Sequence, residues 1–165
     1  ADGAIGSLPR ALSLGYDGVS HKNCKGIVKG LANAATLTEE GKKRDRPLHF
    51  SGEDLANVGP IALFQDLAMM GTLGIEHVER NGHHYFKGLS AWPEPVRRAM
   101  LENHPDLYGL HSEGYPALRI QNGKLDLKSL NQAPFGPTKL LDVSSLEQVD
   151  LTDSEAFIRV GLPLS

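Results

Sequence analysis

Apolar and polar positions alternate between two periods along the first half of the chain. Three segments space their apolar side chains three and four residues apart, as a helix does: residues 7–15, 26–43 and 60–71. Three shorter segments have an extended pattern: residues 18–22, 47–51 and 74–79. Strands that alternate with helices of this length predict βαβ units and a parallel sheet.

The pattern changes after residue 79. Residues 80–92 form a polar, glycine-containing loop in this interpretation, and residues 95–103 a short helix. The pair Asn122-Gly123 predicts a tight turn between two strands, residues 117–121 and 124–128. The rest is rich in proline and leucine and predicts a covering tail. We therefore expect two parts, residues 1–92 with the β/α units and residues 93–165 with the helix, hairpin and tail.

The number of units limits the possible architectures. A complete (β/α)₈ barrel needs about 250 residues, or roughly 30 for each unit. This chain of 165 residues offers three strand candidates before residue 80, so it cannot close such a barrel alone. We predict a partial TIM-type barrel, and either an upstream part of the same protein or a complementary chain supplies the missing strands. A small open α/β sheet is the alternative.

Charge and cysteine content narrow the possible partners. The net charge of −3 lacks the basic excess of a nucleic-acid surface. Cys24 is the only cysteine, which excludes an intrachain disulfide and favours a reducing, cytoplasmic location. No apolar run approaches the roughly 20 residues that span a bilayer. The absence of an initial methionine favours a processed chain or a fragment.

Polar side chains gather where the three predicted strands end, which is where barrel enzymes place their catalytic groups. The first end carries Ser20, His21 and Lys22, the second His49, Ser51 and Glu53, and the third His77, Glu79 and Asn81. Side chains alternate along a strand, so Ser20/Lys22, His49/Ser51 and His77/Glu79 should each share a face. If desolvation and neighbouring cations lower its pKa, Lys22 can act as a base. Otherwise it is a solvated lysine or an ion-pair partner of Glu53 or Glu79.

Several of these segments resemble the enolase superfamily, and more narrowly its mandelate racemase and muconate lactonizing enzyme group. The segment Gly18-Val19-Ser20-His21-Lys22-Asn23-Cys24-Lys25-Gly26 resembles the sixth barrel strand, which ends in a lysine. Residues 47–53 are similar to the seventh strand and its loop, and residues 77–79 to the eighth. Residues 118–125 and Pro134-Phe135-Gly136 resemble the segment that returns to the capping domain.

The resemblance implies that this chain is the last three β/α units of such a barrel. It implies a lyase or isomerase that removes the proton α to a carboxylate, often of a sugar acid, and stabilises the enediolate with Mg²⁺. Lys22, Glu53 and Glu79 would be catalytic, and Ser20, His21, His49, Ser51, His77 and Asn81 would bind substrate. The metal ligands and the second-strand acid/base would lie upstream of residue 1, so we expect no metal ligand in this chain. We expect a small carboxylate substrate and a homo-oligomer. A non-catalytic acid-binding or structural barrel domain is the alternative.

Overall fold

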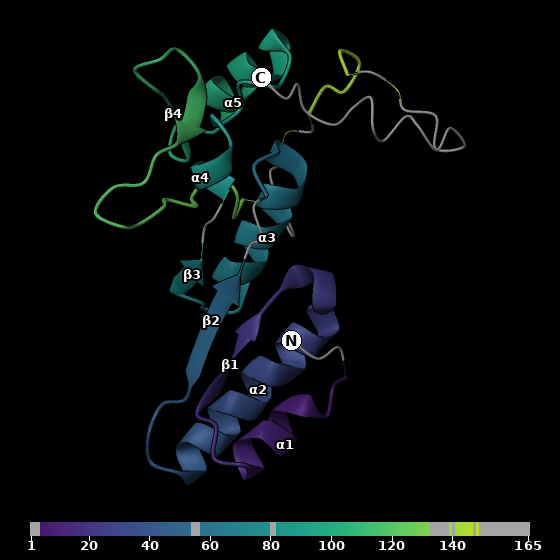
Figure 1. The fold of residues 1–165 in the computed structure, drawn as a ribbon, viewed down its shortest axis with the longest axis vertical. Coiled ribbons are helices and arrows are strands. Elements are labelled where there is room, and N and C mark those ends of the chain that lie inside the picture. Colours follow the sequence, from purple (N-terminus) through teal and green to yellow (C-terminus); the bar gives the residue numbers. More distant parts are fainter. Residues whose placement is uncertain are drawn as a thin grey trace.

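The computed structural model of the chain describes residues 4–53, 57–79, 82–132, 139, 141–146 and 148. Its helices are α1 (Ser7–Ser13), α2 (Ile27–Lys43), α3 (Pro60–Thr72), α4 (Gly82–Tyr85) and α5 (Glu94–Asn103), with a 3₁₀ turn η1 (Asn23–Lys25) (Figure 1). Its strands are β1 (Gly18–His21), β2 (His49–Glu53), β3 (His77–Glu79), β4 (Tyr108–Leu110) and β5 (Pro116–Leu118). The chain is therefore a mixed α/β protein.

The first three strands form the parallel sheet that the alternating pattern predicts. They lie in the order β1-β2-β3, and both neighbouring pairs are parallel. The predicted order and direction are confirmed. Within the described residues the sheet stays open, and neither outer edge has a further strand. Membership of a larger barrel stays a prediction.

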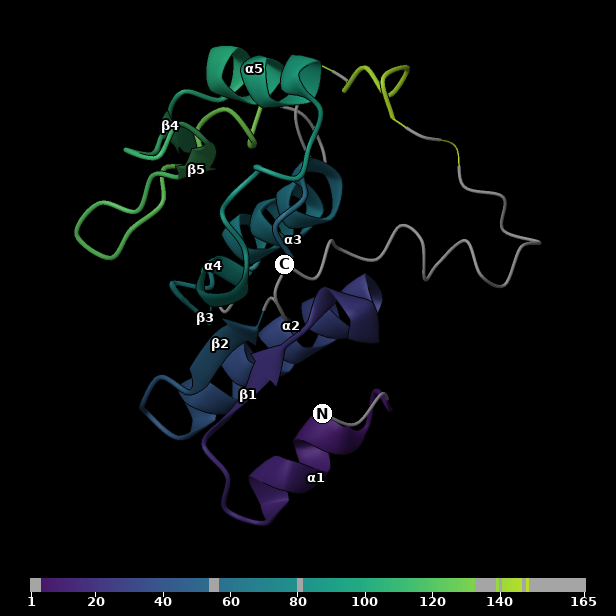
Figure 2. The same ribbon diagram turned by 45° about the horizontal axis from the view of Figure 1, so that its top comes forward.

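Helices α1 and α2 lie on one side of this sheet (Figure 2). The face of α2 that is turned inward consists of Gly30, Asn33 and Leu37, at the spacing of successive helical turns. Leu37 joins Leu8 and Leu12 of α1 in a small buried cluster, against which half-buried Val19, Leu48 and Phe50 pack. We call α1, α2 and β1–β3 the sheet region. Its apolar side is covered by helices.

Helix α3 connects the sheet to a second and larger core. Pro60 starts the helix, where the fixed φ of proline costs nothing, and apolar residues follow around most of its circumference. One side reaches the sheet, because a Cβ atom on Gly52 would lie 2.5 Å from the Met70 sulfur. The other side brings Leu63, Phe64 and Leu67 to residues 82–132, which we call the cap region.

The core of the cap region is continuous with α3. Eight buried side chains form it: Leu63, Phe64, Leu67, Leu89, Met100, Leu107, Tyr108 and Leu130. Leu89 precedes the predicted boundary at residue 92 and Met100 follows it, so this core takes side chains from both sides. The division of the chain at that point stays a prediction.

The predicted turn at Asn122-Gly123 is confirmed, but the strands predicted on either side of it are wrong. Both residues have positive φ, 51° and 73°, as a type I′ turn requires. Only one bridge, between Gln121 and Lys124, closes this turn. Residues 116–118 pair instead with residues 108–110, in the antiparallel register Tyr108↔Leu118 and Leu110↔Pro116. The strand 124–128 does not form, since the upstream strand β4 has already taken its partner.

Two further predictions differ from the structure or lie outside it. The loop predicted for residues 80–92 contains the short helix α4. Most of the predicted covering tail, including residues 134–136, lies outside the described residues. The covering tail therefore stays a prediction.

Candidate functional site

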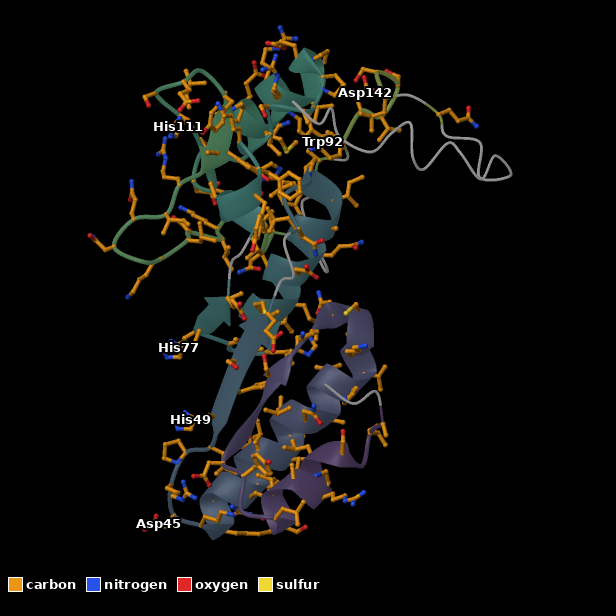
Figure 3. All side chains as sticks on the ribbon, viewed as in Figure 1. Asp45, His49, His77, Trp92, His111 and Asp142 are labelled. Atoms are coloured by element: carbon orange, nitrogen blue, oxygen red, sulfur yellow. The ribbon has the colours of Figure 1, made fainter. Side chains whose placement is uncertain are left out.

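The register of the parallel sheet gathers the predicted polar residues on one face. Ser20 pairs with Ser51, and Ser51 with His77, so these three side chains form a row across the strands. Glu53 pairs with Glu79 in the next row. Figure 3 shows His49 and His77 projecting from the same side of the sheet, away from α1 and α2. We call this surface the polar face.

An ion pair between Lys22 and Glu53 lies at the carboxyl end of the polar face. The Lys22 ammonium contacts Oε2 of Glu53, with side-chain exposures of 18% and 27%. Lys22 follows the last residue of β1, and Glu53 is the last residue of β2. Because neighbouring parallel strands end at the same edge, the two side chains meet without any long loop.

This ion pair shifts the pKa of each group in the direction that favours its charged form. The hydrogen bond from Lys22, and after it the Ser20 hydroxyl, holds the pKa of Glu53 below its ordinary value. The same hydrogen bond to Glu53 raises the pKa of Lys22, and the charge of Glu79 adds to the effect. The sequence leaves two alternatives open for Lys22, a base with a lowered pKa and an ion-pair partner of Glu53 or Glu79, and the structure shows the pair with Glu53. The pKa rises because a carboxylate within hydrogen-bond reach outweighs the partial desolvation of the amine.

His21 does not join the polar face. It is 3% exposed and lies on the helix-covered side, where a Cβ atom on Gly30 would lie 2.5 Å from its Cε1. Its Nε2–H donates to Asn23 Oδ1 at 2.7 Å, and the Asn23 amide donates to Asp66 at 2.7 Å. His21 therefore anchors the β1–α2 connection to α3, so a substrate contact through His21 has no support in this geometry.

The remaining predicted residues divide by position along the strands. Ser20 and Ser51 are half-buried in the middle of the polar face, and His77 and Glu79 are exposed near its carboxyl end. His49 is exposed at the opposite end, two residues before Ser51. Asn81 lies outside the described residues. The structure thus brings together Lys22, Glu53, Glu79, Ser20, Ser51 and His77, and leaves His49 farther along the strand.

A groove of about 950 Å³ runs from the polar face around the edge of β3 to the Asn122-Gly123 turn. Lys124, Leu125 and Leu127 line its far wall. These residues were missed by the sequence reasoning, because they reach the groove through the packing of the cap region. Lys124 brings an ammonium to a groove that already contains Glu53 and Glu79. The groove can accept a small polar ligand that carries a carboxylate.

No metal centre is evident in the part of the chain that the structure describes. No three His, Cys, Asp or Glu side chains there converge as metal ligands would. The resemblance places the magnesium ligands upstream of residue 1, so the magnesium site stays a prediction, and no chemical step below is assigned to a metal.

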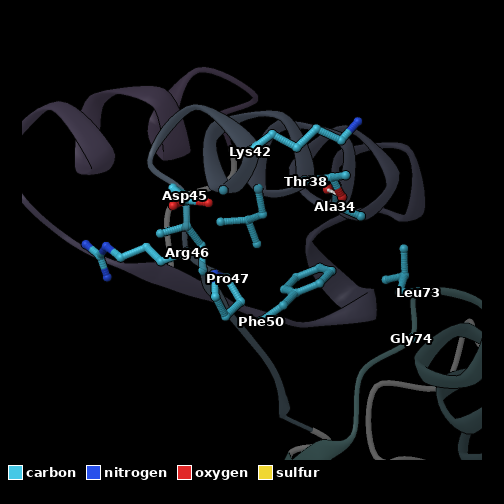
Figure 4. A pocket seen from close by; sticks show the side chains of 12 residues that line it. Ala34, Thr38, Lys42, Asp45, Arg46, Pro47, Phe50, Leu73 and Gly74 are labelled. Carbon is cyan, nitrogen blue, oxygen red and sulfur yellow. Dashed lines mark hydrogen bonds between the residues drawn. The ribbon is translucent and has the colours of Figure 1, made fainter.

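A second cavity, of about 530 Å³, lies at the amino end of β2 (Figure 4). It is bounded by the last turns of α2, by Phe50 and by the Leu73-Gly74 turn. The cations that line it are already paired: Lys42 contacts Glu39 at 2.8 Å, and Arg46 contacts Asp17 at 2.5 Å. It lies at the opposite end of the sheet from the ion pair, and we assign no function to it.

Comparison of the chain with protein-family models, with curated proteins and with solved structures found no match. The enolase resemblance thus stays a hypothesis based on short segments. Across the described residues, no helix is long and apolar enough to cross a membrane.

Proposed function

We propose that this chain contributes part of the active site of an enolase-type lyase or isomerase, which removes the proton α to the carboxylate of a small acid. The observation that supports it is the Lys22–Glu53 ion pair beside Ser20, Ser51, His77 and Glu79, at the carboxyl ends of adjacent parallel strands. Ligands of parallel α/β proteins bind at this end of the strands.

The raised pKa of Lys22 favours a cationic role for this residue. A substrate carboxylate can replace Glu53 as the partner of the Lys22 ammonium. Glu53 is then released, and its pKa rises toward the ordinary value because its main stabilising contact is gone. The freed carboxylate can take the α-proton, while Lys22 stabilises the charge that develops on the enediolate oxygen. This assignment makes Lys22 the electrostatic stabiliser and Glu53 the base.

The remaining parts of the site lie outside the described residues in this proposal. The missing barrel strands would come from an upstream part of the same protein or from a complementary chain. The magnesium ion would be held there too. The open polar face supports this division, because seven polar or charged side chains line one side of three short strands: Ser20, Lys22, His49, Ser51, Glu53, His77 and Glu79.

Exchange of the α-proton with solvent tests the proposal directly. The complete protein is incubated with a panel of small sugar acids and α-hydroxy acids in D₂O, and loss of the α-proton signal is followed by proton NMR. We expect exchange with at least one acid, and we expect Lys22→Ala to slow it by about 10²–10³-fold, as loss of a stabilising donor does in other enzymes.

Lys87→Ala is the matched control, because Lys87 also forms an ion pair, with Glu113 at 2.9 Å, but on the cap region. It should leave the exchange rate unchanged. Equal slowing by both substitutions, or no exchange with any acid, would contradict the proposal.

A non-catalytic acid-binding domain is the second candidate. The Lys22–Glu53 ion pair favours this candidate, because a lysine that is already paired with a carboxylate can hold or bind an acid without taking part in any reaction. Saturable binding of an acid by the complete protein with no deuterium incorporation would select this candidate.

A further inference from the structure

Asp66 is a buried carboxylate that has no part in the proposed reaction. It is 8% exposed and lies on α3, in a run of the helix that also buries Phe64 and Leu67 in the larger core. A charged side chain is costly to bury in apolar surroundings unless hydrogen bonds satisfy its oxygens. The hydrogen-bond partners of Asp66 therefore indicate what this carboxylate does.

Both oxygens of Asp66 accept hydrogen bonds from asparagine side chains. The Asn23 amide donates to Oδ1 at 2.7 Å, and the Asn57 amide donates to Oδ2. The two donors belong to different connections, because Asn23 lies between β1 and α2 and Asn57 lies between β2 and α3. One buried carboxylate thus connects two loops to the same helix.

These two loops follow the strand ends that hold the ion pair. Asn23 comes directly after Lys22, whose extended backbone, with φ −136° and ψ 125°, continues β1. Asn57 comes four positions after Glu53, the last residue of β2. A partly exposed ion pair is weak by itself, because ordering two long side chains costs entropy. Asp66 supplies a constraint on both sides of the pair.

We propose that Asp66 is a positioning residue for the Lys22–Glu53 ion pair. By holding Asn23 and Asn57 on its two oxygens, it fixes the separation of the ends of β1 and β2, and so the approach of the ammonium to the carboxylate. Its effect on the ion pair is independent of any reaction, whereas an effect on removal of the α-proton rests on the proposed function.

The pKa of Glu53, measured by carbon NMR of its side-chain carboxyl group in the full chain, reports how closely Lys22 approaches. Lys22→Ala removes the pair completely and should raise this pKa toward its ordinary value. Asp66→Asn keeps the shape of the side chain but puts an NH₂ group where an oxygen accepted a hydrogen bond, so one loop is released. We expect the Glu53 pKa to rise in this variant as well.

The direction of the change separates positioning from charge. Removing the negative charge of Asp66 without moving the loops favours the charged form of Glu53, so it lowers the pKa of Glu53 or leaves it unchanged. Either of these results with Asp66→Asn overturns the proposal. If Asp66→Asn fails to fold, Asn57→Ala decides, because it removes one link and no charge. It should raise the Glu53 pKa, and an unchanged value overturns the proposal.

Asp106→Asn is the matched control for a general loss of stability. Asp106 is a half-buried carboxylate of the cap region, and it accepts a hydrogen bond from the Ser129 backbone amide at 2.7 Å. Its substitution should lower the urea midpoint and leave the Glu53 pKa unchanged. Equal rises of the Glu53 pKa in Asp66→Asn and Asp106→Asn would show a general loosening of the fold and would overturn the proposal.

Exchange of the α-proton in the complete protein separates this proposal from the proposed function. If an acid exchanges, Asp66→Asn should slow the exchange, but by less than the roughly 10²–10³-fold expected for Lys22→Ala. An unchanged exchange rate would overturn a positioning role in the reaction. If no acid exchanges, the proposed function fails, and the pKa of Glu53 still decides the role of Asp66.

Discussion

The sheet region and the cap region bury their side chains in different ways. Three buried residues, Leu8, Leu12 and Leu37, form the core of the sheet region, whereas eight form the core shared by α3 and the cap region. The smaller core serves only one side of its sheet, and the other side is the polar face. The cap region closes on itself and on α3. The residues with candidate chemistry therefore lie on the less completely packed part of the molecule.

The largest effect is expected for Phe64→Ala, at the centre of the larger core. Phe64 is 4% exposed, and its ring lies 4.6 Å from that of His104 and 6.2 Å from that of Tyr108. Removing a buried ring of this kind costs about 3–5 kcal/mol. Urea unfolding followed by circular dichroism measures the loss. Ile61→Ala, on the same helix but 50% exposed, should stay within about 0.5 kcal/mol of the parent protein.

A smaller loss is expected for Leu37→Ala in the sheet region. Leu37 is 5% exposed, but Val19, Leu48 and Phe50 around it are only half-buried and can move toward the space it leaves. We expect about 2–3 kcal/mol, the low end of the range for buried leucine. Leu31→Ala, 49% exposed on the same helix, is the control in the same urea experiment. A cost for Leu37→Ala equal to that of Phe64→Ala would contradict the difference in packing.

Lowering the pH should reduce the stability of the cap region through His104. This loss of stability is expected to be the smallest of the three effects. Burial lowers the pKa of His104, which is 3% exposed and hydrogen-bonded through Nδ1 to Ser129 Oγ at 2.8 Å. A histidine with a lowered folded-state pKa stabilises the fold above its ordinary pKa of about 6.5, and this stability is lost as the pH falls below that value. Urea midpoints at pH 7.5 and 5.5 should differ less in His104→Gln than in the parent protein.

Exposed His111 provides the matched control for this pH dependence, because it lies in the same region outside the core. His111→Gln should leave the difference between the two midpoints unchanged. If His104→Gln also leaves it unchanged, some other group controls the acid response.

The sequence predicts those elements that depend on neighbouring residues. Helix α3 begins at Pro60 as expected and ends one residue after the predicted end, because its apolar run and its proline act locally. The row Ser20–Ser51–His77 also follows from alternation along each strand. The same alternation places His21 on the opposite face from Ser20 and Lys22, so the sequence already contained the signal against it.

Contacts between distant segments could not be predicted in this way. Lys124 joins the groove because the cap region packs above β3, and no local pattern encodes that approach. The turn at Asn122-Gly123 was predicted correctly, but its strands were not, since β4 competes for residues 116–118. The Lys22–Glu53 ion pair, which raises the pKa of Lys22, is an exception, because Glu53 is one of the two partners that the sequence offers as alternatives for Lys22.

The strand pairings of the two regions also differ in how far apart they lie along the chain. In the cap region Leu110 pairs with Pro116, whereas in the sheet region Gly18 pairs with His49 across the whole of α2. Closing a short loop loses less chain entropy than closing a long one, and pairings distant along the chain form slowly. We therefore expect the β4–β5 hairpin to form early during folding and the parallel sheet to assemble late. The Lys22–Glu53 ion pair would then be among the last contacts to form during folding.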